Sequence, residues 1–232
     1  MIRVLAIVMM ALCVGWAQNQ SIPNTLTKEE QKEGFQLLFD GKSMEKWEAP
    51  SAQAVWAIAD GAIKSNSRAA SAGATMLLTK EDFDNFVLKA EFRAPADIHA
   101  HIFLRQPRRR PRPLSEGGTA AGAKREATEP PGYELQIRDK DPVPLKDGSF
   151  LTGSIVNVAR APADAKVIPG QWNALEVTMD RDHMVVIYNG RKVVDAYDSR
   201  RSSGAVSLHL AEPDKAPGSE IEFRNLRIKR LP

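Results

Sequence analysis

The sequence predicts an all-β protein, an antiparallel sandwich of two sheets or a jelly roll. Apolar and polar residues alternate through several short segments, most clearly over 86–93, as in half-buried strands. The dipeptides Asn189-Gly190 and Asp60-Gly61 each separate two strand-like segments, which is typical of tight hairpins. No helical periodicity of useful length appears after residue 34. Many short strands joined by turns favour an antiparallel two-sheet architecture.

The composition is that of a globular protein. The chain has 232 residues, of which 43% are hydrophobic and 26% are charged, and this excludes wholesale disorder, collagen-like repeats and a polytopic membrane protein. A chain of this length buries roughly 70% of its unfolded surface, so a single domain needs no disulfide or structural metal. The net charge of +3 is too balanced for a dedicated nucleic-acid binder.

Residues 1–17 are expected to be a secretory signal peptide. Arg3 supplies a positive charge, residues 4–14 are apolar, and Gly15 and Ala17 place small side chains before a cut after Ala17. The apolar run is too short to anchor the chain across a bilayer, so we expect no membrane span. This pattern predicts a periplasmic or secreted protein.

A lipoprotein is the alternative interpretation of this leader. It would use Cys13, but Leu12 occupies the position where a small residue is wanted. Cleavage after Ala17 would remove Cys13, which is the only cysteine, so the mature chain would suit an oxidising compartment without depending on disulfides.

The rest of the chain is predicted to be a polar segment followed by one domain. Residues 18–33 are polar, with a short helical turn expected over 27–32, and the domain spans 34–232. A long loop over 106–132 is rich in Pro, Gly, Ala and Arg, and loops of this length are usually functional or disordered. A change of side-chain parity around Arg224-Asn225 predicts a β-bulge.

The start of this loop is strongly basic. The run that begins at Arg105 and ends at Arg112 contains five arginines but no interleaved aromatic residues. Without aromatic residues and with an export signal, nucleic acid is not the expected partner. We interpret the run as a solvated loop, with an anionic glycan or an envelope surface as its candidate contact.

Four expected strands each have one apolar and one polar face, because successive side chains of a strand point to opposite sides. They are the segments around 98–105, 133–138, 204–210 and 220–224. If these strands are neighbours in one sheet, their polar side chains converge on its exposed surface. The candidate site residues on these faces are His99, His101, Arg105, Glu134, Gln136, His209, Glu222 and Arg224.

The exposed side of an antiparallel sheet is ordinarily polar, so any one of these residues could be plain surface. The concentration of His, Gln and Arg favours a functional face. His99 and His101 are also a candidate pair of ligands for a divalent metal, because residues i and i+2 lie side by side, and His209 with Glu134 could complete the site. His183 begins a hairpin strand and is expected to be ordinary surface.

Ordered blocks of the sequence resemble the 3-keto-disaccharide hydrolase domain family, long labelled a domain of unknown function. The first block reads Leu-Phe-Asp-Gly-Lys and is followed by Trp47, and the last reads Glu-Phe-Arg-Asn-Leu. The resemblance extends from about residue 34 to residue 231. Its blocks are 38–42, 56–61, 82–88, 102–105, 132–137, 152–155, 171–173 and 222–226.

The resemblance implies a concanavalin A-like jelly roll that cleaves glycosidic bonds in sugars already oxidised to a ketone at C3, so a carbohydrate is the expected partner. This sequence departs from the family at two places. His99-Ala100-His101 stands where the family commonly has Asn-Ser-Gly, and the segment around His209 differs from a Leu-Gln-x-His-like pattern. Both departures fall on the predicted polar face, so a diverged or lost activity stays open.

The ketone determines what the site must supply. A C3 carbonyl acidifies the C2 proton and makes the C1 substituent a β-leaving group, so cleavage needs a base, a partner for the enolate and an acid. A divalent cation would instead polarise the ketone. The candidates are Glu134 or His101 as base, His209 as acid, Arg105 and Arg224 as enolate partners, and Gln136, His99 and Glu222 as substrate contacts.

A non-catalytic carbohydrate-binding module of the same fold is the alternative function, and an envelope scaffold with a basic arm is a third. Sugar platforms usually present exposed Trp or Tyr side chains. Here Trp47, Trp56 and Trp172 lie in blocks that look structural, and Trp16 leaves with the signal peptide. This favours polar chemistry over stacking, with hydrolysis and β-elimination both open.

Overall fold

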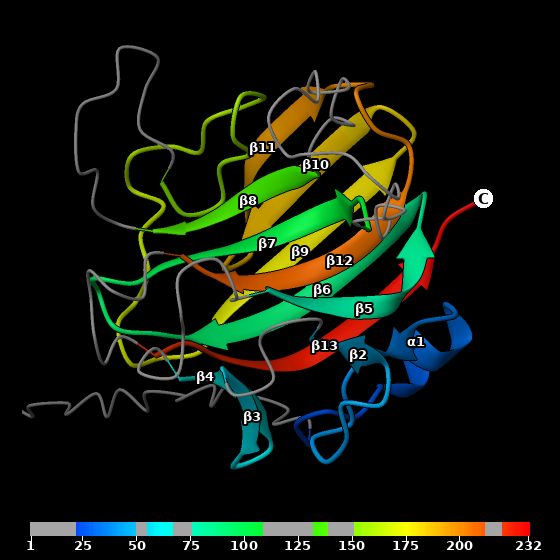
Figure 1. The fold of residues 1–232 in the computed structure, drawn as a ribbon. Helices are drawn as coiled ribbons and strands as arrows, with labels where there is room; N and C mark the ends of the chain where they lie inside the picture. The colour runs from blue at the N-terminus through cyan, green and yellow to red at the C-terminus, as the bar shows by residue number, and fades with distance from the viewer. Residues whose placement is uncertain (1–21, 50–54, 67–75, 109–131, 139–150, 212–219) are drawn as a thin grey trace, which may run out of the picture.

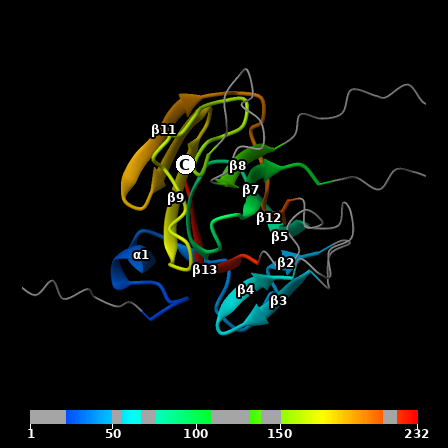
Figure 2. The same cartoon turned by 90° about the vertical axis from the view of Figure 1, so that its left-hand side faces the viewer.

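The computed structural model describes residues 22–49, 55–66, 76–108, 132–138, 151–211 and 220–232. Two antiparallel sheets pack face to face as two layers, which we call the large sheet and the small sheet (Figures 1 and 2). This arrangement confirms the predicted concanavalin A-like jelly roll. The predicted signal peptide and most of the predicted basic loop lie outside the described residues.

The large sheet forms the rear layer in Figure 1. Its neighbouring strands pair antiparallel throughout, and the short strand β1 (Gln36–Leu37) pairs with β13 beside the main path. In spatial order its strands are β11 (Arg191–Tyr197), β10 (His183–Tyr188), β9 (Asn173–Asp180), β6 (Phe86–Arg93), β13 (Glu222–Arg230), β4 (Ala62–Ser65) and β3 (Trp56–Ala59).

The small sheet lies in front of it in Figure 1 and is antiparallel as well. Strands β5 and β7 are the neighbours of β12, although they lie more than 90 residues before it in the sequence. In spatial order the strands are β2 (Trp47–Glu48), β5 (Met76–Phe83), β12 (Gly204–Leu210), β7 (His99–Gln106) and β8 (Tyr133–Arg138).

The core fills the space between the two sheets. Buried and partly exposed residues alternate strictly along β6, where Phe86, Leu88 and Phe92 point inward and are at most 1% exposed. Leu208 of β12 and Ile102 of β7 face them from the small sheet and have no exposed surface. Each such side chain contributes roughly 1.5–3 kcal/mol through its burial, so the alternation predicted from the sequence sets both the core and the outer faces.

Both predicted hairpins are confirmed. Asn189 and Gly190 connect β10 to β11 with φ angles of 47° and 78°, and Asp60 and Gly61 connect β3 to β4 with φ angles of 49° and 71°. Two successive residues with positive φ are the requirement of a type I′ turn, and Asn, Asp and Gly tolerate that conformation best.

The expected helical turn is the five-residue helix α1 (Lys28–Lys32), which begins with a capping box. The hydroxyl of Thr27 accepts a hydrogen bond from the Glu30 N–H, and the Glu30 carboxylate accepts one from the Thr27 N–H. The same carboxylate binds Arg227 of β13 at 2.6 Å, so the helix is attached to the large sheet. Within the described ranges no helix is long and apolar enough to cross a bilayer.

The predicted β-bulge in β13 is confirmed. The register between β13 and β6 shifts between Arg224 and Arg227, and Asn225 has a φ of 53°. The bulge turns Asn225 toward the N-terminal segment, where its side-chain oxygen accepts a hydrogen bond from the Asn24 N–H. The Asn225 N–H in turn donates to the side-chain oxygen of Asn24 at 2.8 Å. The bulge therefore attaches the start of the described chain to its end.

Replacing Asn225 by Ala should test this attachment. Asn225→Ala leaves the buried Asn24 N–H without an acceptor and puts alanine, which tolerates the left-handed region less well than Asn, at a positive φ, so the free energy of unfolding should fall by about 3 kcal/mol in urea titrations. Asn157→Ala is the control, because Asn157 also has positive φ but is exposed, and it should cost about 1 kcal/mol. Equal losses in the two variants would contradict the proposed role of Asn225.

Candidate active site

Three of the four strands predicted to share a polar face are neighbours. Strands β12, β7 and β8 lie side by side in the small sheet, whereas β13 belongs to the large sheet. The cross-strand pairs His209↔His101 and His101↔Gln136 form one row across the three strands, and Phe103↔Glu134 lies in the adjacent row. The sequence prediction was therefore correct for three strands and wrong for the fourth.

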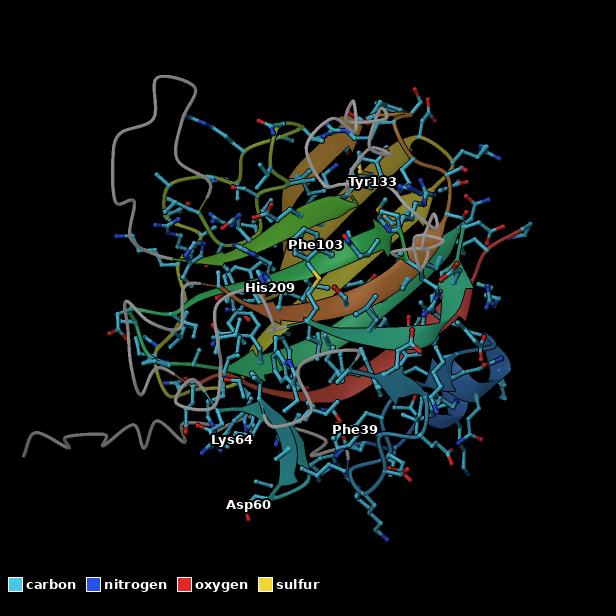
Figure 3. All side chains as sticks on the ribbon, viewed as in Figure 1. Phe39, Asp60, Lys64, Phe103, Tyr133 and His209 are labelled. Carbon is cyan, nitrogen blue, oxygen red and sulfur yellow. The ribbon has the colours of Figure 1, made fainter. Side chains whose placement is uncertain are left out.

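The polar side of these three strands, opposite the core, is the candidate site, and we call it the histidine face. Figure 3 shows Phe103 and His209 close together on the side of the small sheet that faces away from the core. Their rings are 5.6 Å apart. The histidine face consists of His99, His101, Phe103, Glu134, Gln136, Arg138, Ser207 and His209.

His101 lies at the centre of the histidine face and is 5% exposed. Its Nδ1 lies 3.0 Å from the Nδ1 of His209, and its Nε2 lies 3.0 Å from the Nε2 of His99. The same Nε2 lies 3.1 Å from Oε1 of Glu134, which also accepts a hydrogen bond from Gln136 Nε2 at 2.8 Å. Both ring nitrogens of His101 are thus within hydrogen-bond distance of partners in the site.

Burial sets the charge state of this cluster. Burial lowers the pKa of His101 well below its usual value, and His99, His209 and Arg138 add to that effect. Burial also lowers the pKa of His209 to about 4, with a smaller contribution from His99. For Glu134 burial raises the pKa, against a hydrogen bond from Gln136 that lowers it. At neutral pH His101 and His209 are therefore neutral, and neutral imidazole can accept a proton.

The predicted metal site does not fit this geometry. His101 turns its two nitrogens toward different histidines, so the three imidazoles do not converge on one point. The guanidinium of Arg138 lies 3.3 Å from the Nε2 of His99 and would repel a cation there. In the part of the chain that the structure describes, no group of three or more His, Cys, Asp or Glu side chains is placed to hold a metal ion.

Arg105 does not lie on the histidine face, contrary to the parity prediction. The register between β12 and β7 shifts after Phe103, and Arg105 has a φ of 53°, so a bulge reverses the direction of its side chain. Arg105 is 1% exposed. Its guanidinium donates to the backbone carbonyls of Asp84, Arg181 and Arg201 at 2.7–2.9 Å, so its role is to satisfy buried carbonyls.

Gly204 makes this bulge possible. A Cβ on Gly204 would lie 2.5 Å from the carbonyl carbon and oxygen of Arg105, which is closer than atoms can approach. The backbones of β12 and β7 therefore come together here only because residue 204 has no side chain.

Arg224 and Glu222 lie on the outer face of the large sheet, so the prediction that they share the site is wrong. Arg224 donates to Glu91 at 2.8 Å and its guanidinium lies 4.0 Å from the ring centre of Trp172. Glu222 accepts a hydrogen bond from Arg93 at 2.7 Å. Alternation along β13 correctly separates its polar from its apolar face, but it does not reveal which sheet contains the strand.

Three residues of the histidine face were not predicted as site residues. Arg138 is the cation of the face, and its parity with Glu134 and Gln136 was the signal that could have identified it. Phe103 packs its ring against those of His101 and His209. Ser207 has no exposed surface, and its hydroxyl has no hydrogen-bond partner within the described ranges.

Two further predictions concern residues that lie outside the site. His183 lies on β10 of the large sheet, where it pairs with Asp195 at 2.8 Å, as expected of a surface histidine. Arg108, at the start of the basic run, binds Glu48, Asp82 and the carbonyl of Thr79. The remaining arginines of the run lie outside the described residues.

A substitution of Arg105 separates a structural from a catalytic role. Arg105→Met leaves three buried carbonyls without a donor and should lower the free energy of unfolding by about 3–5 kcal/mol in urea titrations. Arg105→Lys keeps the charge but not the several N–H donors of the guanidinium, so its free energy of unfolding should fall by an intermediate amount. A variant with wild-type stability and no activity would instead favour the role that the sequence suggested.

The depressed histidine pKa predicts acid sensitivity. An unfolded histidine takes up a proton below about pH 6.5, whereas folded His209 does so only near 4, so acidification favours unfolding. His209 alone should lower the free energy of unfolding by about 2 kcal/mol between pH 6.5 and pH 5. Glu134 acts in the opposite direction, because its raised pKa lets the folded state bind a proton more readily than the unfolded state.

Urea titrations at the two pH values measure this effect. His209→Asn should be less sensitive to acid than wild type by about 2 kcal/mol, and the surface variant His183→Asn should behave like wild type. An unchanged pH dependence in His209→Asn would show that this imidazole is not held neutral by the fold.

The two sheets and the cluster of imidazoles on the small sheet define a jelly-roll protein with a polar site outside its core. A family model described as "3-keto-alpha-glucoside-1,2-lyase-like domain" matches residues 34–229, and the chain belongs to this family. This confirms the resemblance found in the sequence blocks. A comparison with curated proteins gave no match.

Solved structures share the fold at low sequence identity. A protein from Parabacteroides distasonis, described as a glycosyl hydrolase, is 21% identical, with a TM-score of 0.69 over 91% of this chain and 100% of its own. A second protein so described, from the same organism, is 19% identical, with a TM-score of 0.61 over 85% of this chain and 99% of its own. A carbohydrate-binding module from Bacillus subtilis is 14% identical, with a TM-score of 0.51 over 79% and 96% of the respective chains.

Proposed function

We propose that this protein cleaves the glycosidic bond of 3-keto-glycosides on the histidine face. The observation that carries the proposal is the row of contacts that leads from neutral His209 through neutral His101 to the half-buried carboxyl of Glu134. Such a group can remove a weakly acidic proton at neutral pH, and the family and the glycosyl hydrolase among the similar structures indicate that the proton belongs to a sugar.

The geometry favours His209 as the base, whereas the sequence suggested Glu134 or His101 as the base and His209 as the acid. His101 is 5% exposed with both nitrogens directed at partners, and Oε1 of Glu134 already accepts from Gln136. His209 uses Nδ1 toward His101, which leaves Nε2 as the nitrogen that can meet a substrate. Glu134 and His101 then support His209 instead of contacting C2 themselves.

The reaction proceeds through the enolate. His209 takes the proton from C2, and the electron pair of that C–H bond passes into the ketone to form an enolate. When the enolate collapses, the C3 ketone re-forms, a C1–C2 double bond forms, the C1–O bond breaks and the leaving oxygen takes up a proton from water. Addition of water to the resulting unsaturated ketone would give net hydrolysis. The enolate step is common to both outcomes.

We also propose that the chain is exported, since residues 1–17 have the pattern of a signal peptide. A carbohydrate outside the cytoplasm is then the substrate. The part of the basic run beyond Arg108 would contact an anionic glycan or envelope surface, because it is rich in arginine and follows a strand of the site sheet, whereas Arg105 is buried.

Exchange of the C2 proton tests the function directly. Purified protein in D2O is incubated with a 3-keto-disaccharide, with the unmodified disaccharide, and with each in EDTA, and NMR follows cleavage and deuterium at C2. We expect cleavage only of the keto sugar. His209→Asn should lower kcat roughly 10²–10⁴-fold, as for loss of a general base, whereas His183→Asn should retain wild-type turnover.

Three outcomes would contradict the proposal. Full activity of His209→Asn would eliminate His209 as the base. Loss of activity in EDTA with recovery on adding a divalent metal would show that the reaction depends on an ion that the described side chains do not accommodate. Binding of either sugar without cleavage or exchange would identify a carbohydrate-binding module.

A further inference from the structure

The polar side chains of the histidine face form one continuous chain of short contacts across β8, β7 and β12. It runs from Arg138 to His99 at 3.3 Å, from His99 to His101 at 3.0 Å and from His101 to His209 at 3.0 Å. A branch leads from His101 to Glu134 at 3.1 Å. Each contact needs one donor and one acceptor, so the position of one proton constrains all the others.

Arg138 determines the first proton position. A guanidinium donates hydrogen bonds and cannot accept them, so the Nε2 of His99 must offer its lone pair to Arg138. The Nε2 of His101 lies 3.0 Å from that same nitrogen, so His101 must carry its proton on Nε2. The same proton is shared with Oε1 of Glu134 at 3.1 Å, an oxygen that also accepts a hydrogen bond from Gln136.

The remaining positions follow from the neutral state of His101. A neutral imidazole has one N–H, so the Nδ1 of His101 is an acceptor and the Nδ1 of His209 must donate to it at 3.0 Å. The proton of His209 is therefore on Nδ1. Its Nε2 carries the lone pair.

We propose that the hydrogen-bonded row from Arg138 to His209 is a proton relay of fixed direction, in which Arg138 and His99 are positioning residues and Glu134 is the final proton acceptor. The proposal rests on the proposed function for the source of the proton. It assigns roles that the contact distances alone leave undefined, because the direction depends on which nitrogen of each ring carries its proton.

The relay moves one proton in three balanced transfers. The Nε2 of His209 accepts the proton from C2 of the sugar, and the Nδ1 proton of His209 passes to the Nδ1 of His101. The Nε2 proton of His101 then passes to Oε1 of Glu134. Both rings end neutral with their protons on the opposite nitrogens, and the negative charge moves from the carboxylate of Glu134 to the enolate of the sugar. The proton on Glu134 then faces the lone pair on Nε2 of His101, and the contact of His101 with His99 loses its hydrogen bond until the proton returns.

The acidities of the two ends favour this direction. Burial raises the pKa of Glu134 and lowers that of His209 to about 4, and both shifts act in this direction. Among the described residues, the titratable and charged side chains on the face of His209 are His99 and His101 from β7, Glu134 and Arg138 from β8, and Glu48 from β2 beyond β5. On the other side of β12, the facing strand β5 presents Met76, which is uncharged.

Nitrogen NMR measures the proton positions directly. The protein has four histidines, so ¹⁵N-histidine labelling with long-range ¹H–¹⁵N correlation gives four ring patterns, assigned from single His→Asn variants. We expect protons on Nδ1 of His99, Nε2 of His101 and Nδ1 of His209 at neutral pH. A proton on Nε2 of His209 or on Nδ1 of His101 in the wild-type protein would overturn the proposal.

Arg138→Met tests the positioning role. Without the donor the rings should populate both tautomers, and kcat for the keto sugar should fall about tenfold with KM unchanged, because only a fraction of molecules then present the lone pair of His209. The matched control is Arg224→Met, which removes an arginine from the large sheet and should leave the ring patterns as in wild type. Unchanged ring patterns in Arg138→Met would overturn the proposal.

The two proposals fail separately. If wild type neither cleaves the keto sugar nor exchanges its C2 proton, the proposed function is wrong, yet the wild-type ring patterns still decide whether the row has the proposed direction. If Arg138→Met does not fold, those wild-type patterns and the loss of activity in Glu134→Gln, at least tenfold with the fold retained, decide the relay.

Discussion

The antiparallel pairing of β12 with β7, and of β7 with β8, is the constraint on which the site depends. This pairing puts His209, His101 and Gln136 in one row, although 73 residues separate Gln136 from His209 in the chain. The same alternation that directs Ile102 and Leu208 into the core directs the imidazoles to the opposite side. The polar contacts of the histidine face contribute less free energy than the burial of the core. Core burial therefore holds these polar groups together.

Local patterns sufficed for most of the fold, and they failed where the backbone changes direction or where the partner of a strand matters. Both hairpins and the bulge at Asn225 follow from residues whose φ preference or parity is visible in the sequence. The side chain of Arg105 was predicted on the wrong face because nothing in the sequence indicates that this arginine has a positive φ. Gly204, which permits the bulge, lies 99 positions away. Arg224 was misplaced because period-2 alternation is the same in either sheet.

For the site, the sequence identified most of the residues but not which of them are in contact. His99, His101, His209, Glu134 and Gln136 do come together, since the polar faces of their three strands are contiguous. Which of them is buried, and which nitrogen meets which partner, depends on distances of about 3 Å that no pattern encodes. Arg138 illustrates this point: its position on the polar face was evident, but its contact with His99 required the cross-strand register.

The bulge at Arg105 has a consequence for the evolution of this scaffold. One guanidinium serves the carbonyls of residues 84, 181 and 201, which belong to turns from three separate parts of the chain. Lengthening any one of these turns would remove its carbonyl from the shared donor and weaken the other two. We therefore expect insertions and deletions among relatives to avoid these three turns together.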